Sequence, residues 1–227
     1  MSCKTEDPSQ IIYPNDAPDG EAIKSMNSNI GHFCVFLKVS DEFDENYGEE
    51  ERQKLIDFYK ERISLHEKSK FLDENHTIEN RFKDSGFDLV VPCVKDSALV
   101  QDGIYFYNPG QKKLCNLRVK VGIYKVDDDW GELGPTKYPS PFYLYARSSI
   151  YKTPFILANN VGIIDSGYRG NICTALYNTH STPEVVEMGK RIAQICMPDL
   201  SFNFHVRLVK ELSDTSRGSG GFGSTGQ

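Results

Sequence analysis

The 227-residue sequence contains no apolar run near the roughly 20 residues that a membrane-spanning helix needs. It has no excess of basic charge either, because its formal net charge is −6, so no nucleic-acid surface is expected. The six cysteines include no CxxC pair and the five histidines show no metal-ligand spacing, which favours reduced core thiols over a zinc site. The first ten residues, MSCKTEDPSQ, lack the apolar segment of a signal peptide. We therefore expect a cytoplasmic or nuclear protein that binds neither nucleic acid nor membrane.

Short segments rich in β-branched and aromatic residues make up most of the remaining chain. Hydrophobic residues are 39% and charged residues 26% of the sequence, which is typical of a soluble globular domain. Such regularly spaced segments with turn residues between them favour an all-β barrel or sandwich. The expected strands are residues 32–39, 88–94, 103–107, 117–125, 142–146, 172–177, 191–197 and 202–209, with a turn at 108–113.

One segment, residues 49–70, has helical periodicity instead. Leu55, Ile56, Tyr59 and Ile63 recur at the spacing of one helix face. Three glutamates at its start and lysines at its end complement the helix dipole. Two interpretations stay open: a surface helix that packs its apolar stripe on the β domain, or a helix that binds a partner.

The two ends and one internal segment lack such periodicity. Residues 1–30 are rich in Pro, Asp, Asn and Ser and are expected to form a flexible arm before a domain at 31–210. Residues 211–227 are expected to form a glycine-rich arm, mobile until a ligand binds, because Phe222 is the only large hydrophobic residue after Ser213. Residues 126–140 are polar and contain Gly and Pro, so they are expected to form a loop.

Residues 162–171, GIIDSGYRGN, are the most informative stretch of the chain. Two isoleucines lead into Asp165, small residues follow, and Tyr168 precedes a second β-type run. This pattern predicts a hairpin whose turn carries one carboxylate and one aromatic ring. By itself it also fits a solvated turn in which Asp165 serves only turn formation.

This stretch resembles the third motif of the trimeric dUTPases, and four other stretches resemble the remaining motifs in the family's order. They are residues 85–89 (SGFDL), 147–149 (RSS), 189–194 (GKRIAQ) and 217–226 (RGSGGFGSTG). The resemblance extends from residue 82 to the C-terminus, with residues 32–39 as the first strand. It implies a dUTPase-like distorted jelly-roll β-barrel in which the helix at 49–70 and the loop at 126–140 are insertions.

The resemblance also implies an activity, the hydrolysis of dUTP to dUMP and pyrophosphate. Asp165 would orient and deprotonate the attacking water, since an ordinary Asp side chain, with a pKa of about 3.9, is ionised at neutral pH. Tyr168 would pack on the deoxyribose. The backbone of residues 159–165, including Asn159 and Gly162, would read uracil.

The other motif residues match the family's phosphate contacts. Arg147, Ser148, Ser149 and Gln194 correspond to contacts of the second and fourth motifs. In the C-terminal arm, Phe222 would stack on uracil, and the γ-phosphate would be held by Arg217, Gly223, Ser224 and Thr225. The resemblance implies Mg²⁺ between the phosphates, with Asp88 near its bound waters. It further implies a homotrimer with shared active sites.

Two alternatives are kept beside this interpretation. The dCTP deaminases share the fold, but their catalytic glutamate corresponds here to Ala175 and one of their arginines to Lys152. A dUTPase-like nucleotide-binding or interaction protein could instead recruit a partner through the inserted helix. Because no motif lies in residues 49–70, their deletion is expected to leave turnover largely intact.

Two residues in or beside the motifs depart from the family's usual pattern. Ala146 stands where the family usually has proline, and Lys190 stands where glutamate is common.

Overall fold

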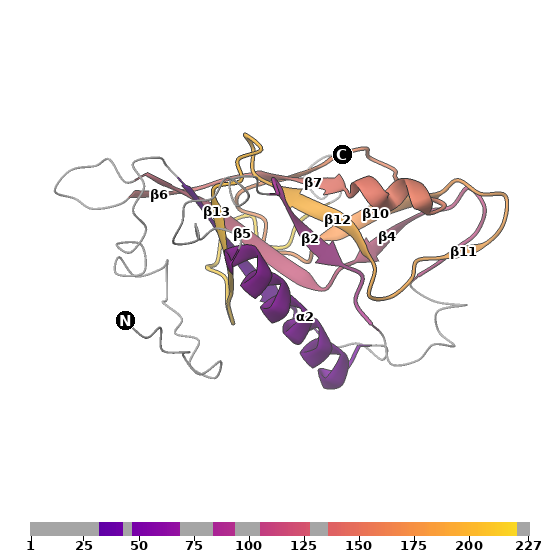
Figure 1. The fold of residues 1–227 in the computed structure, drawn as a ribbon, viewed down its shortest axis with the longest axis horizontal. Coiled ribbons are helices and arrows are strands. Elements are labelled where there is room, and N and C mark those ends of the chain that lie inside the picture. The colour runs from indigo at the N-terminus through magenta and orange to yellow at the C-terminus, as the bar shows by residue number, and fades with distance from the viewer. Residues whose placement is uncertain (1–31, 43–46, 69–83, 94–104, 128–135, 222–227) are drawn as a thin grey trace, which may run out of the picture.

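The computed structural model describes residues 32–42, 47–68, 84–93, 105–127 and 136–221. These residues form β-strands, one α-helix and one short 3-10 helix (Figure 1). The predicted all-β fold with a single α-helix is therefore confirmed. No helix in this part of the chain has the length and apolarity to cross a membrane. The predicted N-terminal arm, residues 1–30, lies outside the described residues.

The strands form four hydrogen-bonded sheets, whose orders and bounds are as follows. The first is β13 (Phe204–Leu208), β1 (His32–Val39), β5 (Val119–Asp127), β6 (Thr136–Pro139). The second is β4 (Lys112–Asn116), β10 (Cys173–Asn178), β8 (Phe155–Leu157). The third is β11 (Glu184–Val185) with β3 (Phe106–Tyr107). The fourth is β2 (Gly86–Val90), β12 (Arg191–Cys196), β7 (Phe142–Ala146), β9 (Gly162–Ile164).

Strand β5 shows how alternating residues build the core. Val119, Val121 and Ile123 are all buried, as the alternation in the sequence predicts. The predicted strands at 32–39 and 142–146 have the observed bounds of β1 and β7. Strand β4 was not expected, because its first two residues fall in the predicted turn at 108–113. Pairing with β10 extends these residues despite their weak strand pattern.

The predicted hairpin at the third motif is wrong in its pairing. Strand β9 pairs with β7, whereas β10 pairs with β4 and β8, so the two strands belong to different sheets. The chain is diverted at Ile172, whose N–H donates to the Val119 carbonyl at 2.7 Å and whose carbonyl accepts from the Leu117 N–H at 2.9 Å. The stretch after Asp165 is therefore a connection between sheets.

The predicted loop at 126–140 is shorter in the structure, because strands occupy both of its ends. Strand β5 continues to Asp127, and β6 pairs with it antiparallel from Thr136 to Pro139. The residues between them, 128–135, lie outside the described part of the chain.

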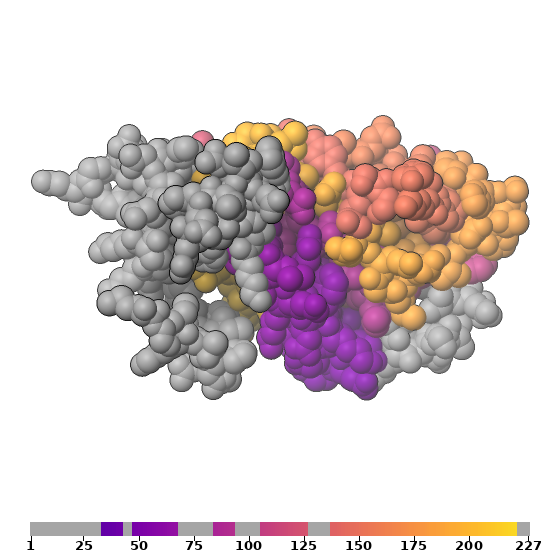
Figure 2. Space-filling model, in the orientation of Figure 1, coloured from indigo at the N-terminus to yellow at the C-terminus, as the bar shows by residue number. Residues whose placement is uncertain are grey.

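Helix α2 (Glu49–Lys68) packs on the sheet of β1 and β13 and occupies the lower front of Figure 1. Leu55 and Tyr59 are buried, and the Tyr59 hydroxyl accepts the Val90 N–H at 3.2 Å. Near the other end of the helix, His66 stacks on Phe204 with ring centroids 4.6 Å apart. The packing interpretation is thus confirmed. The opposite face of α2 is exposed in Figure 2. Residues 69–70 of the predicted helix lie outside the described residues.

Candidate active site

The sheet β2-β12-β7-β9 brings the predicted motifs next to one another. Gln194 of β12 lies opposite Asp88 of β2 on one side and Tyr145 of β7 on the other. Arg147 follows β7 directly, and Asp165 follows β9. Four motifs that are separated in the sequence are thereby placed on adjacent strands or at their ends.

One cavity at this sheet, which we call the arginine cavity, has a volume of about 690 Å³. Its walls come from α2, from β2 and the residues just before it, from the end of β7 and the residues just after it, and from β12 and the turn after it. The lining residues are Arg62, Asp84, Ser85, Gly86, Asp88, Tyr145, Ala146, Arg147, Ser148, Arg191, Gln194, Cys196 and Leu200. The predicted residues Asp88, Arg147, Ser148 and Gln194 therefore meet in one place.

Asp88 is the buried centre of this cavity, with 3% of its surface exposed. Its Oδ1 is 2.6 Å from Nε of Arg147. Its Oδ2 is 2.9 Å from an Nη of Arg191 and 3.4 Å from an Nη of Arg62. A buried carboxylate requires such partners, because desolvating an unpaired charge is costly. Three guanidinium groups thus converge on one carboxylate.

Arg147 is held by its neighbours as well as by Asp88. Its backbone N–H donates to the Ile192 carbonyl at 3.0 Å, which attaches it to β12. Its guanidinium donates to Ser149 Oγ at 3.3 Å and to the Arg191 carbonyl at 3.4 Å. Ser148 and Ser149 begin the 3-10 helix η3 (Ser148–Lys152). The predicted RSS motif is therefore one locally bonded unit.

Gln194 reaches the cavity because Gly86 lies beside it. Its Nε2 donates to the Ala146 carbonyl at 3.3 Å. A Cβ at residue 86 would lie only 2.8 Å from Cδ of Gln194. Only glycine leaves this amide in its present position.

Among the cavity residues that the sequence analysis did not propose, Arg62 and Arg191 are the two that pair with Asp88. Arg191 lies within the GKRIAQ motif, so the motif itself was a signal. Arg62 lies in the inserted helix, which matches no motif, and its sequence context contains no comparable signal. Its place at the cavity also weakens the expectation that residues 49–70 can be deleted without effect on turnover.

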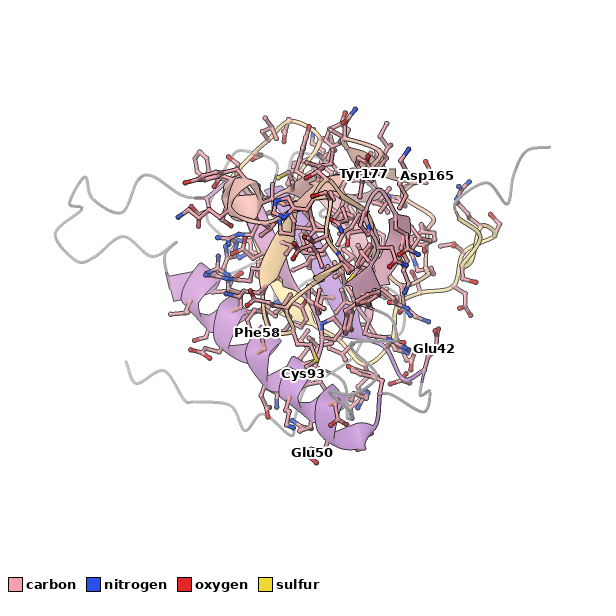
Figure 3. All side chains as sticks on the ribbon, turned by 90° about the vertical axis from the view of Figure 1, so that its right-hand side faces the viewer. Glu42, Glu50, Phe58, Cys93, Asp165 and Tyr177 are labelled. Atoms are coloured by element: carbon pink, nitrogen blue, oxygen red, sulfur yellow. The ribbon has the colours of Figure 1, made fainter. Side chains whose placement is uncertain are left out.

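The second cavity, of about 210 Å³, lies at the third motif and is called the turn cavity. Its lining contains the predicted residues Asn159, Gly162, Asp165, Tyr168 and Arg217. The remaining lining residues are Leu144, Ile163, Ile164, Cys173 and Gly221. It shares no residue with the arginine cavity. Figure 3 shows Asp165 on the side of the molecule away from α2.

Asp165 is accessible, with 54% of its side chain exposed. Its Oδ2 is 2.8 Å from an Nη of Arg217. Tyr168 is partly buried, and its hydroxyl donates to the Asn171 carbonyl at 2.9 Å. Burial raises the pKa of Tyr168, so the phenol stays protonated at neutral pH. The tyrosine ring also lies against Gly221, where a Cβ would come within 3.1 Å of it.

The first part of the C-terminal arm lies on the third motif of its own chain. Arg169 donates from Nε to the Ser213 carbonyl at 2.7 Å, and its backbone N–H donates to the Gly218 carbonyl at 2.8 Å. The Thr215 hydroxyl donates to the Gly167 carbonyl. Residues 213–221 are therefore bonded to the stretch that holds Asp165. The predicted ligands Phe222, Gly223, Ser224 and Thr225 lie outside the described residues.

The described residues contain no group of three or more His, Cys, Asp or Glu side chains that could hold a metal ion. Asp88 is the one buried aspartate of the arginine cavity, and both its oxygens are paired with arginines. This donor set fits a hard cation held by phosphate oxygens and waters, but not one held by a protein cage.

Comparisons with known proteins agree with these observations. The dUTPase family model matches residues 140–226. The "Deoxyuridine 5'-triphosphate nucleotidohydrolase" of Histophilus somni (strain 2336) is 33% identical over 132 residues, which cover 57% of this chain and 78% of that protein. The chain belongs to the dUTPase family.

Other dUTPase relatives match shorter parts of the chain. The Desulfitobacterium hafniense nucleotidohydrolase of the same name (strain DSM 10664 / DCB-2) is 48% identical over 86 residues, or 37% of this chain. This chain spans 56% of that relative's length. Among solved structures, the Streptococcus mutans dUTPase is similar at 23% identity with a TM-score of 0.35, over 49% of this chain and 75% of that one.

Proposed function

We propose that the chain is a dUTP pyrophosphatase that hydrolyses dUTP to dUMP and pyrophosphate. The observation that carries the proposal is the arginine cavity, where three guanidinium groups face one buried carboxylate beside Ser148 and Gln194. Such a site has excess positive charge and directed donors for phosphate oxygens. Phosphoryl transfer depends mainly on this kind of positioning and charge neutralisation.

The proposed reaction is an in-line attack of water on the α-phosphorus. Asp165 accepts a proton from the water as the new phosphorus–oxygen bond forms. The bond from the α-phosphorus to the oxygen that bridges to the β-phosphorus breaks, and pyrophosphate leaves with that bond's electron pair. A base positioned in this way contributes on the order of 10²–10⁴ in rate.

The turn cavity supplies selectivity for the nucleoside in this proposal. The Tyr168 ring, fixed by its hydrogen bond to the Asn171 carbonyl, packs on the deoxyribose and excludes a 2′-hydroxyl. The backbone around Asn159 and Gly162 pairs with the uracil edge. A site that hydrogen-bonds one base edge strongly rejects bases with other donors and acceptors.

Different residues are proposed to bind the three phosphates of dUTP. Arg147, Ser148, Ser149 and Gln194 bind the α- and β-phosphates, and Arg217 and the arm beyond it bind the γ-phosphate. Asp88 would hold Mg²⁺ indirectly, through hydrogen bonds to waters bound to the ion. The ion would neutralise triphosphate charge when bound.

We further propose a homotrimer with shared active sites. Its support is that the arginine cavity and the turn cavity, which both serve the proposed reaction, have no residue in common within one chain. A second chain that presents its turn cavity to the arginine cavity of the first would complete the site.

The experiment that tests the activity is a panel of dUTP, dCTP, dTTP and UTP with magnesium, in which pyrophosphate and ammonia are both measured. Pyrophosphate should appear rapidly from dUTP alone, and no ammonia should appear. Comparable turnover of UTP would contradict the assignment, and ammonia from dCTP would indicate a deaminase instead.

A further inference from the structure

Arg62 is directed to the arginine cavity by the way α2 packs. Tyr59, three residues before it, is fully buried, and His66, four residues after it, is 8% exposed. Residues three and four apart lie on one face of a helix, so both neighbours hold Arg62 on the inner face. The Tyr59 hydroxyl is bonded to Val90 at the end of β2, which carries Asp88. The position of Arg62 relative to Asp88 is therefore set by core packing.

The contacts of Arg62 leave much of its binding capacity unused. One Nη is 3.4 Å from Asp88 and 3.9 Å from Asp84, whose side chain is 82% exposed. Its Nε is buried and has no hydrogen-bond partner among the described residues. Buried donors are normally satisfied, and an unsatisfied one is costly. The carboxylates beside Arg62 therefore do not take up the full donor capacity of its guanidinium.

The charges in the cavity favour an anionic ligand. Arg147 and Arg191 already lie within 2.9 Å of Asp88, so Arg62 is not needed to neutralise that carboxylate. With Arg62, the cavity holds three positive charges against the buried Asp88 and the exposed Asp84, so it has one positive charge in excess. A cavity of about 690 Å³ has room for a chain of phosphates.

We propose that Arg62 of the inserted helix is a further phosphate-binding guanidinium of the active site, in the same cavity as Arg147 and Arg191. This inference rests on the proposed function. It makes α2 a contributor to the site and not only a covering of the β domain. Because the contact is to phosphate, Arg62 strengthens binding of di- and triphosphates and is indifferent to the base.

The test uses inorganic pyrophosphate as the probe and calorimetry on the full chain. Arg62→Gln should weaken pyrophosphate binding by about tenfold or more, as expected for loss of a charge-assisted contact. Arg62→Lys should recover part of the loss, because it restores the charge without the planar fork. Lys60→Gln is the matched control, since the Lys60 side chain lies on the same helix, is 41% exposed and pairs with Asp57 at 3.6 Å. It should bind pyrophosphate like the wild type.

A purely structural tie between Arg62 and Asp88 predicts a different outcome. In that case Arg62→Gln would lower the melting temperature and leave pyrophosphate affinity unchanged, which would overturn the proposal. A second measurement uses the wild-type chain, so it tests the proposal even if Arg62→Gln does not fold. Pyrophosphate should protect Arg62 of the wild-type chain from modification by phenylglyoxal, read by peptide mass spectrometry, and unprotected Arg62 would likewise overturn the proposal.

The experiments distinguish a failure of the Arg62 proposal from a failure of the proposed dUTPase activity. If the chain fails to hydrolyse dUTP but the Arg62 effect on pyrophosphate binding remains, the phosphate site stands and the substrate is wrong. If dUTP is hydrolysed with unchanged KM in Arg62→Gln, the function stands and the role of Arg62 is wrong.

Discussion

The arginine cavity and the turn cavity hold charged groups in opposite ways. In the arginine cavity a carboxylate with 3% exposure is enclosed by three guanidiniums on a sheet and a packed helix. In the turn cavity, Asp165 has a half-exposed side chain at the end of a three-residue strand and contacts one arginine of the C-terminal arm. The first arrangement suits a permanent anion-binding site, and the second suits a group that must exchange partners during a reaction.

The largest expected effect on turnover concerns Asp165, the proposed base in the turn cavity. Asp165→Asn should lower turnover of dUTP by about 10²-fold or more and change substrate affinity little, because the amide keeps the shape but cannot accept the proton. Asp57→Asn, on the exposed side of α2, is the control and should behave as the wild type. Steady-state kinetics and binding of a non-hydrolysable analogue separate the two quantities. If Asp165→Asn retains more than roughly a tenth of the rate, Asp165 is not the base.

The second prediction concerns whether residues from different chains complete one active site. It also tests which chain supplies the C-terminal arm. Asp165→Asn with an intact arm is co-expressed with a chain truncated after Asp214. If the third motif and the arm of one site come from different chains, random mixing in trimers should restore about a quarter of the sites. Differential tags verify that mixed trimers form.

The single-chain structure supports a contrary outcome of this experiment. Arg169 and Thr215 bond residues 213–221 to the third motif of the same chain. If that arrangement persists in the assembly, no mixed site combines an intact Asp165 with an intact arm, and no activity returns. Absence of recovery in verified mixed trimers would therefore assign both elements to one chain.

A moderate effect is expected from a small change in the arginine cavity. Gly86→Ala would place a Cβ against the Gln194 amide and displace it, so KM for dUTP should rise by about tenfold with a smaller change in kcat. Gly122→Ala is the control, because its Cβ would make an ordinary 3.6 Å contact with Leu212. An unchanged KM in a folded Gly86→Ala variant would show that Gln194 does not position substrate.

The smallest effect concerns Glu42, an exposed residue that contacts the turn cavity only through Asn171, whose carbonyl accepts the Tyr168 hydroxyl. Glu42 accepts from Lys120 at 2.8 Å and from Asn171 at 3.1 Å. The hydrogen bond from Lys120 is the main cause that lowers the pKa of Glu42 below its usual 4.5. Its contribution to stability is therefore present above about pH 4.5 and disappears as the pH falls through the lowered value.

Glu42→Gln should accordingly lower the free energy of unfolding by at most about 1 kcal/mol at pH 7, since the ion pair is screened by solvent. Urea titrations at pH 7 and near pH 3.5 measure the difference, which should shrink at the lower pH. An equal difference at both values would mean that the charge of Glu42 is not involved.

Local sequence patterns were sufficient for several parts of the molecule. Strand β1 and strand β7 have their predicted bounds, because short runs of β-branched and aromatic residues favour strands. Helix α2 begins at its predicted residue, where Glu49, Glu50 and Glu51 complement the dipole. The resemblance to the dUTPase motifs, and not a local pattern, placed Asp88, Arg147, Ser148 and Gln194 in one expected site, and these four residues line one cavity.

The tertiary structure alone decided which of these elements meet. Strands β9 and β10 are neighbours in sequence but pair in different sheets, because strand partners are chosen by long-range register and not by the turn between them. Arg62 has the local sequence of any charged helix residue, and only the packing of Tyr59 and His66 on the β domain brings it to Asp88. Side-chain direction on a packed helix depends on what the opposite surface offers, which a single segment of sequence does not contain.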